Sequence, residues 1–220
     1  MSRQLSIDIY LDFICPWCLI GKRQLQRAQR MLLDEQPDVQ LRTVWHGVQL
    51  LPQLPTQGEN FAQFYRYRLG SADAVRARQA QVQQACAEVG VAIDFSRIST
   101  LPNTADAHRL LERARALGDA ERVDALIERL FAAYFQQGMD LGCRSTLLAI
   151  AQASGFQAQA LTDWLHGDGR PFTGRTKATR GVPSFHFNGH LQLIGAQPAQ
   201  LLLDAMRHTL LASTSARQAV

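Results

Sequence analysis

The sequence predicts an α/β fold that is interrupted by a large all-helical insertion. Apolar and polar residues alternate near the N-terminus, and a helix and a second strand follow. More than a hundred residues with helical periodicity come next, and the chain closes with a hairpin and a helix. Because the closing hairpin is too short to hold a core of its own, one split domain is favoured over two domains in series.

The first part, residues 1–50, is predicted as strand, turn, helix and strand. The alternating apolar positions of the first strand are Leu5, Ile7, Ile9 and Leu11. A helix should begin after Cys15 and end before Pro37, with the basic residues Lys22, Arg23, Arg27 and Arg30 on a solvated face. Residues 39–45 are expected to form the second strand.

Residues 51–171 form the predicted insertion. Prolines and glycines up to residue 60 predict a loop. Helices should then end near Gly90, Gly118 and Gly138, with Asn103 or Thr104 capping the second of them. Ser145 is expected to cap a fourth helix, and residues 157–166 to form a fifth.

The closing part, residues 172–213, is predicted as a hairpin and a helix. Asn188-Gly189 is a strong hairpin signal, since both turn positions need a positive φ. Strands are expected at 184–188 and 190–194, and Pro198 suits the first turn of a final helix. Residues 214–220 are small and polar and are expected to fray.

Composition limits the class of protein. The chain has 220 residues, of which 46% are hydrophobic and 19% charged, as in ordinary soluble proteins. The net charge is +4 and the pI is about 9.1, without the clustered basic stripe of a nucleic-acid binder. No apolar run approaches the roughly 18 residues of a membrane span, and the first residues do not resemble a signal peptide. We therefore expect a cytoplasmic protein that binds neither nucleic acid nor membrane.

The most informative motif is Cys15-Pro16-Trp17-Cys18, which follows a strand and opens a helix. This context is typical of a thioredoxin-like redox pair. Cys15 would lie at the helix N-terminus, where unpaired N–H groups and the helix dipole favour the thiolate, which is the nucleophile. Pro16 suits the first helical turn, and Trp17 should shield the sulfurs and offer a contact surface to substrates.

The motif predicts a two-step exchange. The Cys15 thiolate attacks a substrate disulfide and forms a mixed disulfide, and Cys18 then attacks Cys15 and releases the substrate. The reverse sequence oxidises a substrate dithiol. A structural zinc site is the alternative, but zinc needs about four ligands and Cys86 and Cys143 stand alone, so we expect no metal. The redox-active disulfide would serve in place of a cofactor.

Gly181-Val182-Pro183-Ser184-Phe185 stands immediately before the hairpin. Pro183 is either a simple turn residue or a cis-proline, which is a rare and specific choice.

Together these motifs resemble the DsbA-like thioredoxin-fold oxidoreductases, and within them the cytosolic FrnE-like subgroup. The resemblance rests on the segments at 12–22 (DFICPWCLIGK), 102–110 (PNTADAHRL), 181–185 (GVPSF) and 195–198 (GAQP). It implies a thioredoxin-like fold, Cys15 as nucleophile and Cys18 as resolving cysteine. It also implies that Pro183 is the cis-proline facing the sulfurs and that Val182 presents its backbone to an extended substrate. The stretch containing Asn103 and His108 would line the substrate cleft.

Other residues have two interpretations each. Asp12 either relays protons to Cys18 during exchange or serves as a solvated or capping group. His108 either approaches the sulfurs or is structural. Cys86 lies on an apolar helical face and is expected in the core, whereas Cys143 is expected to be exposed.

Three functions are compatible with these patterns. The first is a thiol–disulfide oxidoreductase that acts on disulfide or dithiol substrates, with glutathione as a candidate co-substrate. The second is a glutathione-dependent isomerase or transferase of the same superfamily, and the third is a non-enzymatic binding module. Retention of both Cys15 and Cys18 favours the first. No pattern predicts an oligomeric state.

Overall fold

A computed structural model describes residues 3–174 and 180–218, with the side chains of 214–218 left out. By its internal contacts the chain divides into two compact units. Unit 1 consists of residues 1–11, 17–46 and 177–220, and unit 2 of residues 12–16 and 47–176. The chain therefore passes from unit 1 to unit 2 and back within the segment that carries the Cys15–Cys18 motif.

Unit 1 is a mixed α/β unit with a four-stranded sheet in the order β2-β1-β5-β6. Its strands are β1 (Arg3–Leu11), β2 (Val39–Gly47), β5 (Ser184–Phe187) and β6 (Leu191–Ile194). Its helices are α1 (Pro16–Glu35) and α8 (Ala199–Gln218). The predicted strand–helix–strand start and the closing hairpin and helix are confirmed.

The register of β1 and β5 separates an apolar from a polar sheet face. Ile7 pairs with Phe187 and Ile9 with Phe185, in antiparallel register, and all four are buried. Phe185 approaches Gly21, so α1 covers this face. An ion pair of 2.5 Å between Arg207 and Glu35 holds α8 to α1. The other face carries polar side chains, because strand residues alternate between the two faces.

The hairpin turn has the expected geometry, with φ of 48° at Asn188 and 72° at Gly189. Helix α8 continues to Gln218, and the expected fraying of residues 214–220 stays a prediction. Its alanine, serine, arginine and glutamine residues are all compatible with a helix.

The prediction of a solvated basic face on α1 is wrong for Lys22. This residue is 1% exposed, and its ammonium lies 5.8 Å from the Trp45 ring centroid.

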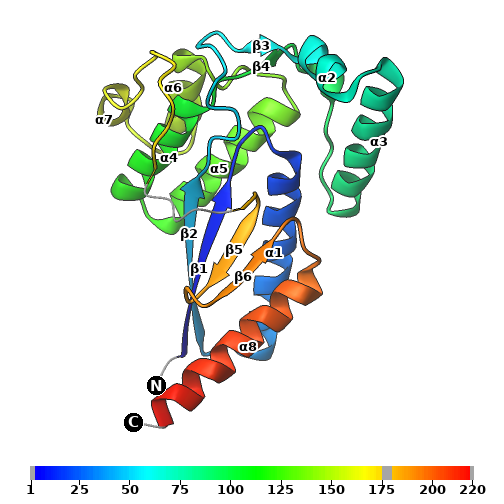
Figure 1. The fold of residues 1–220 in the computed structure, drawn as a ribbon. Helices are drawn as coiled ribbons and strands as arrows, with labels where there is room; N and C mark the ends of the chain where they lie inside the picture. Colours follow the sequence, from blue (N-terminus) through cyan, green and yellow to red (C-terminus); the bar gives the residue numbers. More distant parts are fainter. Residues whose placement is uncertain (1–2, 175–179, 219–220) are drawn as a thin grey trace. The chain divides into compact units, whose positions relative to one another are not determined.

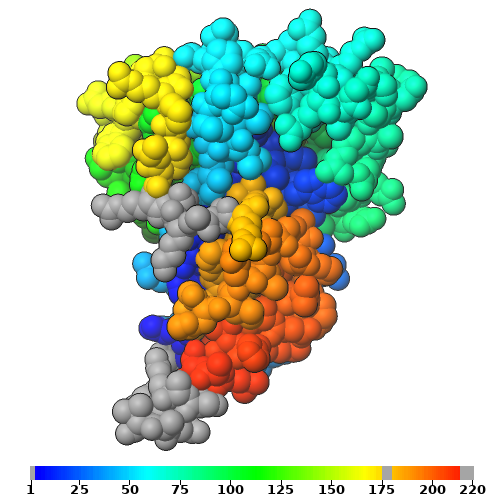
Figure 2. Space-filling view, in the orientation of Figure 1, coloured from blue at the N-terminus to red at the C-terminus, as the bar shows by residue number. Residues whose placement is uncertain are grey.

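Unit 2 is helical apart from a short antiparallel pair of strands, β3 (Glu59–Asn60) and β4 (Thr100–Leu101). A 3₁₀ turn, η1, spans Phe95–Arg97. The helices are α2 (Phe61–Leu69), α3 (Ala72–Glu88), α4 (Ala105–Leu117), α5 (Ala120–Phe135), α6 (Arg144–Ala153) and α7 (Gln159–Thr162). Figure 2 shows α2 and α3 packed side by side in space-filling form. Cys143 rather than Ser145 is the N-cap of α6, which corrects the predicted cap.

Candidate active site

Cys15 lies at the start of α1, as the sequence predicts. It directly precedes Pro16, the first helical residue, and its backbone N–H donates to the carbonyl of Asp12 across 3.1 Å. Cys15 is 7% exposed. Cys15 therefore lies in a hydrogen-bonded turn at the N-terminus of a 20-residue helix. At this end the helix dipole favours negative charge.

Cys18 lies in the first turn of α1 and is 2% exposed. Pro16 and Trp17, between the two cysteines, are partly exposed. The chain thus carries two cysteines one helical turn apart in sequence, with a proline and an aromatic side chain between them.

The Val182–Pro183 bond is cis, as the resemblance implied. Within unit 1, a Cβ built on Gly21 would come within 2.9 Å of Pro183 Cγ, so the proline ring packs closely on α1 at this glycine. Gly21 is three residues beyond Cys18 and therefore on the same face of the helix. Pro183 and Val182 consequently lie beside the helix face that carries the second cysteine.

Asp12 is fully buried in unit 2 and is held by hydrogen-bond donors. Its Oδ2 accepts from the Leu50 backbone N–H at 2.7 Å, and its Oδ1 lies 3.1 Å from His108 Nε2 on α4. Both side chains of this pair are 0% exposed. The interpretation of Asp12 as a solvated strand end is therefore wrong, and no sequence pattern identifies the histidine 96 residues away as its partner.

His108 is enclosed by the residues around it. Its ring stacks on Phe13 at 5.3 Å and lies 5.3 Å from the Phe172 ring, tilted by 32°. A Cβ on Gly47 would come within 2.5 Å of His108 Nδ1. That nitrogen has no hydrogen-bond partner among the described residues. The imidazole is thus packed in apolar surroundings, with one polar contact, to Asp12.

Asn103 connects three segments of unit 2. Its side-chain oxygen accepts from the Ala105 N–H at the start of α4 and from Gln49 Nε2. Its amide donates to the carbonyl of Leu54 at 2.7 Å and to that of Gly169 at 3.3 Å. Asn103 therefore supplies the side-chain cap that Thr104, the N-cap residue, does not provide.

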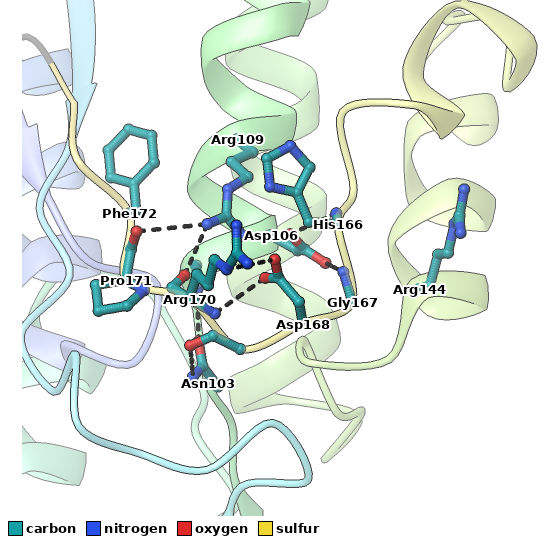
Figure 3. Close-up of polar contacts among 12 residues, drawn as sticks. Asn103, Asp106, Arg109, Arg144, His166, Gly167, Asp168, Arg170, Pro171 and Phe172 are labelled. Carbon is teal, nitrogen blue, oxygen red and sulfur yellow. Dashed lines mark hydrogen bonds and ion pairs between the residues drawn. The ribbon is translucent and has the colours of Figure 1, made fainter.

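Asp106 and Arg109, one turn apart on α4, fasten the segment after α7 (Figure 3). Asp106 accepts from the backbone N–H groups of His166 and Gly167 and from Arg109. Arg109 donates to the carbonyl of Arg170. Because this segment continues to Phe172, the network also fixes the ring that covers His108.

Two tyrosines that the motifs did not reveal belong to the same neighbourhood. Burial, and then the charges of Cys15 and Asp12, raise the pKa of Tyr65 on α2. Burial, and then the charges of Tyr65, Asp12 and Asp140, raise the pKa of Tyr134 on α5 well above its usual range. The hydroxyl of Tyr134 is buried without a partner in the described part of the chain. A propensity or motif argument could not find them, because neither lies in a recognisable pattern.

The other two cysteines lie apart from the motif. Cys86 is fully buried on α3, as predicted, and burial raises the pKa of its thiol to about 11. Cys143 is exposed, and hydrogen bonds, the largest from Ser145, lower the pKa of its thiol to about 7. Across residues 3–174 and 180–218, no group of three or more histidine, cysteine or acidic side chains is placed to bind a metal ion. In the same ranges no helix is long and apolar enough to cross a membrane.

A strand, a Cys-Pro-Trp-Cys turn, a helix and a cis-proline before the closing hairpin together define a thioredoxin-fold protein with a helical insertion. Residues 6–207 match the family model of the DSBA-like thioredoxin domain, and the chain belongs to this family. No curated protein sequence matches it.

Several solved structures share the fold. A probable DsbA oxidoreductase from Streptomyces coelicolor has a TM-score of 0.77 at 20% identity, covering 93% of this chain and 89% of its own. A 2-hydroxychromene-2-carboxylate isomerase has a TM-score of 0.55 at 13% identity, covering 97% and 98%. The cytosolic disulfide reductase DsbM from Pseudomonas aeruginosa has a TM-score of 0.52 at 16% identity, covering 98% and 100%. At these identities the similarity shows the fold alone.

Proposed function

We propose that this protein is a thiol–disulfide oxidoreductase whose redox pair is Cys15 and Cys18. The observation that carries the proposal is the placement of Cys15 directly before α1 and of Cys18 in its first turn. Membership of the DSBA-like family and the cis-proline beside α1 support it.

The exchange is balanced without a bound cofactor. The Cys15 thiolate attacks one sulfur of a substrate disulfide, a Cys15–substrate disulfide forms, and the other substrate sulfur leaves as a thiolate that takes up a proton. The Cys18 thiolate then attacks Cys15, and the second substrate sulfur leaves in the same way. The substrate gains two electrons, and the Cys15–Cys18 disulfide that results needs two equivalents of a small thiol, such as glutathione, to return to the dithiol.

Val182 and Pro183 are proposed to contact the substrate chain next to α1, with Trp17 as a neighbouring apolar surface. An extended substrate would meet the backbone of Val182 in a strand-like contact. We also propose that the protein belongs to the FrnE-like subgroup. Its proposed location is the cytoplasm. The structural neighbour from P. aeruginosa is a cytosolic disulfide reductase, which supports this location, and cell fractionation tests it.

Reduction of insulin or glutathione disulfide tests the activity. Cys15→Ser should abolish turnover, whereas Cys18→Ser should lose turnover but accumulate a mixed disulfide on Cys15. Cys143→Ser is the matched control, because it removes an exposed thiol outside the motif and should leave turnover unchanged. If the wild type reduces disulfides and Cys18→Ser accumulates no mixed disulfide, the two-step scheme is wrong.

A glutathione-dependent isomerase is the second candidate, because the fold is shared with an isomerase of this superfamily. It predicts an activity that needs glutathione and survives Cys18→Ser. Loss of all activity in that variant, together with mixed-disulfide capture, would exclude it.

A further inference from the structure

We propose that Ser184 is a positioning residue for an extended polypeptide substrate. Its hydroxyl is held by Gln192 and His186. Through its backbone it fixes Val182 and Pro183, the segment that such a substrate would contact. The inference rests on the proposed function, since it concerns the same segment. It names the substrate class as a polypeptide disulfide, because a disulfide without a peptide backbone would gain little from a fixed strand-like contact.

Ser184 stands where the sheet begins and the substrate-contacting segment ends. It is the first residue of β5 and pairs with Tyr10 on β1 and with Ile194 on β6. Figure 1 shows β5 between these two strands. Pro183 directly precedes Ser184, and the Pro183 carbonyl accepts from the Gly195 N–H at 2.8 Å. A movement of Ser184 would therefore move Pro183 with it.

The segment is held from both faces of the sheet. On the side of α1, a Cβ built on Gly21 would come within 2.9 Å of Pro183 Cγ and 3.1 Å of Phe185 Cζ. Ser184 lies between Pro183 and Phe185 in the sequence, so its side chain points to the opposite face. There it is 0% exposed. The contacts of Ser184 on the polar face are thus the counterpart of the packing of Pro183 on α1.

The hydroxyl of Ser184 has two side-chain partners. Gln192 Nε2 on β6 donates to Ser184 Oγ at 3.1 Å, and His186 Nε2 on β5 lies 3.0 Å from the same oxygen. A glutamine amide nitrogen only donates, so the hydroxyl accepts from Gln192 and can give its own proton to the imidazole. The His186 ring in turn lies 4.7 Å from the ring of Tyr10. The network therefore joins β1, β5 and β6 at the level of Ser184.

Such a network contributes more to position than to stability. Both partners of the hydroxyl reach water, since Gln192 is exposed and His186 is partly exposed. In Ser184→Ala they would form new hydrogen bonds with water, so little stability should be lost. Two directed hydrogen bonds, by contrast, restrict how Ser184 can move. A substrate that binds to a segment of fixed shape loses less entropy than one that must order this segment.

The test measures the steady-state reduction of two disulfides by the full-length protein, with glutathione as the reductant. Insulin supplies a polypeptide disulfide, and hydroxyethyl disulfide supplies one without a peptide backbone. For Ser184→Ala, KM for insulin should rise about fivefold, the factor that corresponds to one net hydrogen bond. The value of kcat, and KM for hydroxyethyl disulfide, should change by less than about twofold, as expected for a loss of uniform binding to the polypeptide alone.

Gln192→Met tests the same contact from its exposed end. It removes the donated hydrogen bond and keeps the length of the side chain, so KM for insulin should rise about two- to threefold. Combining it with Ser184→Ala should add little, because changes within one hydrogen-bond network are not additive. Gln192→Met also decides the matter if Ser184→Ala does not fold. Gln200→Met is the matched control, because it removes an amide that donates to Asp204 on α8 and should leave KM unchanged.

The inference and the proposed function fail in different ways. Equal rises of KM for both disulfides, or a fall in kcat at constant KM, would show a general structural loss and would overturn the positioning role. An unchanged KM for insulin in both Ser184→Ala and Gln192→Met would overturn it as well. These results leave the proposed function standing. A wild-type protein that reduces neither disulfide would overturn the proposed function, and the inference with it.

Discussion

Among the residues that the structure describes, two Asp–His pairs differ in their access to water. His108 and Asp12, in unit 2, are 3.1 Å apart and 0% exposed. His46 and Asp8, in unit 1, are closer at 2.7 Å, but their side chains are 19% and 33% exposed. Tyr10 stacks on the His46 ring at 4.8 Å and lies 4.7 Å from the tilted His186 ring, on the polar face of the sheet. The shorter distance does not identify the stronger interaction, because water screens the pair in unit 1 and not the pair in unit 2.

The two thiols outside the motif, those of Cys86 and Cys143, also differ in their access to water. Their reactivity should show the largest difference of all the predictions. At pH 7 a thiol of pKa about 7 is about half ionised, whereas one of pKa about 11 is ionised in about one molecule in ten thousand. Cys143 should therefore be alkylated at neutral pH, with a rate that rises through pH 7, while Cys86 should stay unmodified. Peptide mapping after brief iodoacetamide treatment measures both. Equal labelling of the two cysteines in the folded protein would contradict the contrast.

Asp12→Ala should have the largest effect on stability. It leaves the Leu50 N–H and the His108 ring buried without their acceptor, and each buried polar group left unsatisfied costs about 1–3 kcal/mol. Urea unfolding followed by circular dichroism measures the change. A loss below about 1 kcal/mol would mean that water reaches the pair and that the two Asp–His pairs are alike.

Gly47→Ala should have an intermediate effect, because the added methyl would lie 2.5 Å from His108 Nδ1. The His108 ring or the backbone at Gly47 must shift, and such overpacking destabilises by about 1–3 kcal/mol. The matched control is Gly189→Ala in the hairpin turn, where a Cβ meets no atom within 4 Å and only the positive φ is strained. If Gly47→Ala unfolds at the wild-type urea concentration, His108 is not held as tightly as the packing indicates.

The sequence predicts the elements of both units better than it predicts their polar contacts. Strand alternation, the Asn188-Gly189 turn and glycine helix stops depend on neighbouring residues, so local rules find them. The Asp12–His108 contact joins residues 96 positions apart, and no local pattern encodes such a pairing. The lining of the substrate cleft by Asn103 and His108, which the resemblance implies, stays a prediction, and the structure adds that Asn103 joins three backbone segments. The prediction that Lys22 is solvated is wrong because no local pattern encodes its burial. Lys22 lies against Trp45, which belongs to a strand that follows later in the chain.

Asp8→Ala should have the smallest effect. Its carboxylate loses the 2.7 Å contact with His46, but partly exposed pairs contribute only about 0.2–1 kcal/mol because water and salt screen them. The difference from wild type in urea unfolding should shrink further in 1 M NaCl, where the screening length is about 3 Å. His46→Gln is the matched control, because it keeps a hydrogen-bond donor and removes the ionisable ring. A salt-independent loss above about 2 kcal/mol would show that the exposed pair is as well shielded as the buried one, and the contrast between the two would no longer hold.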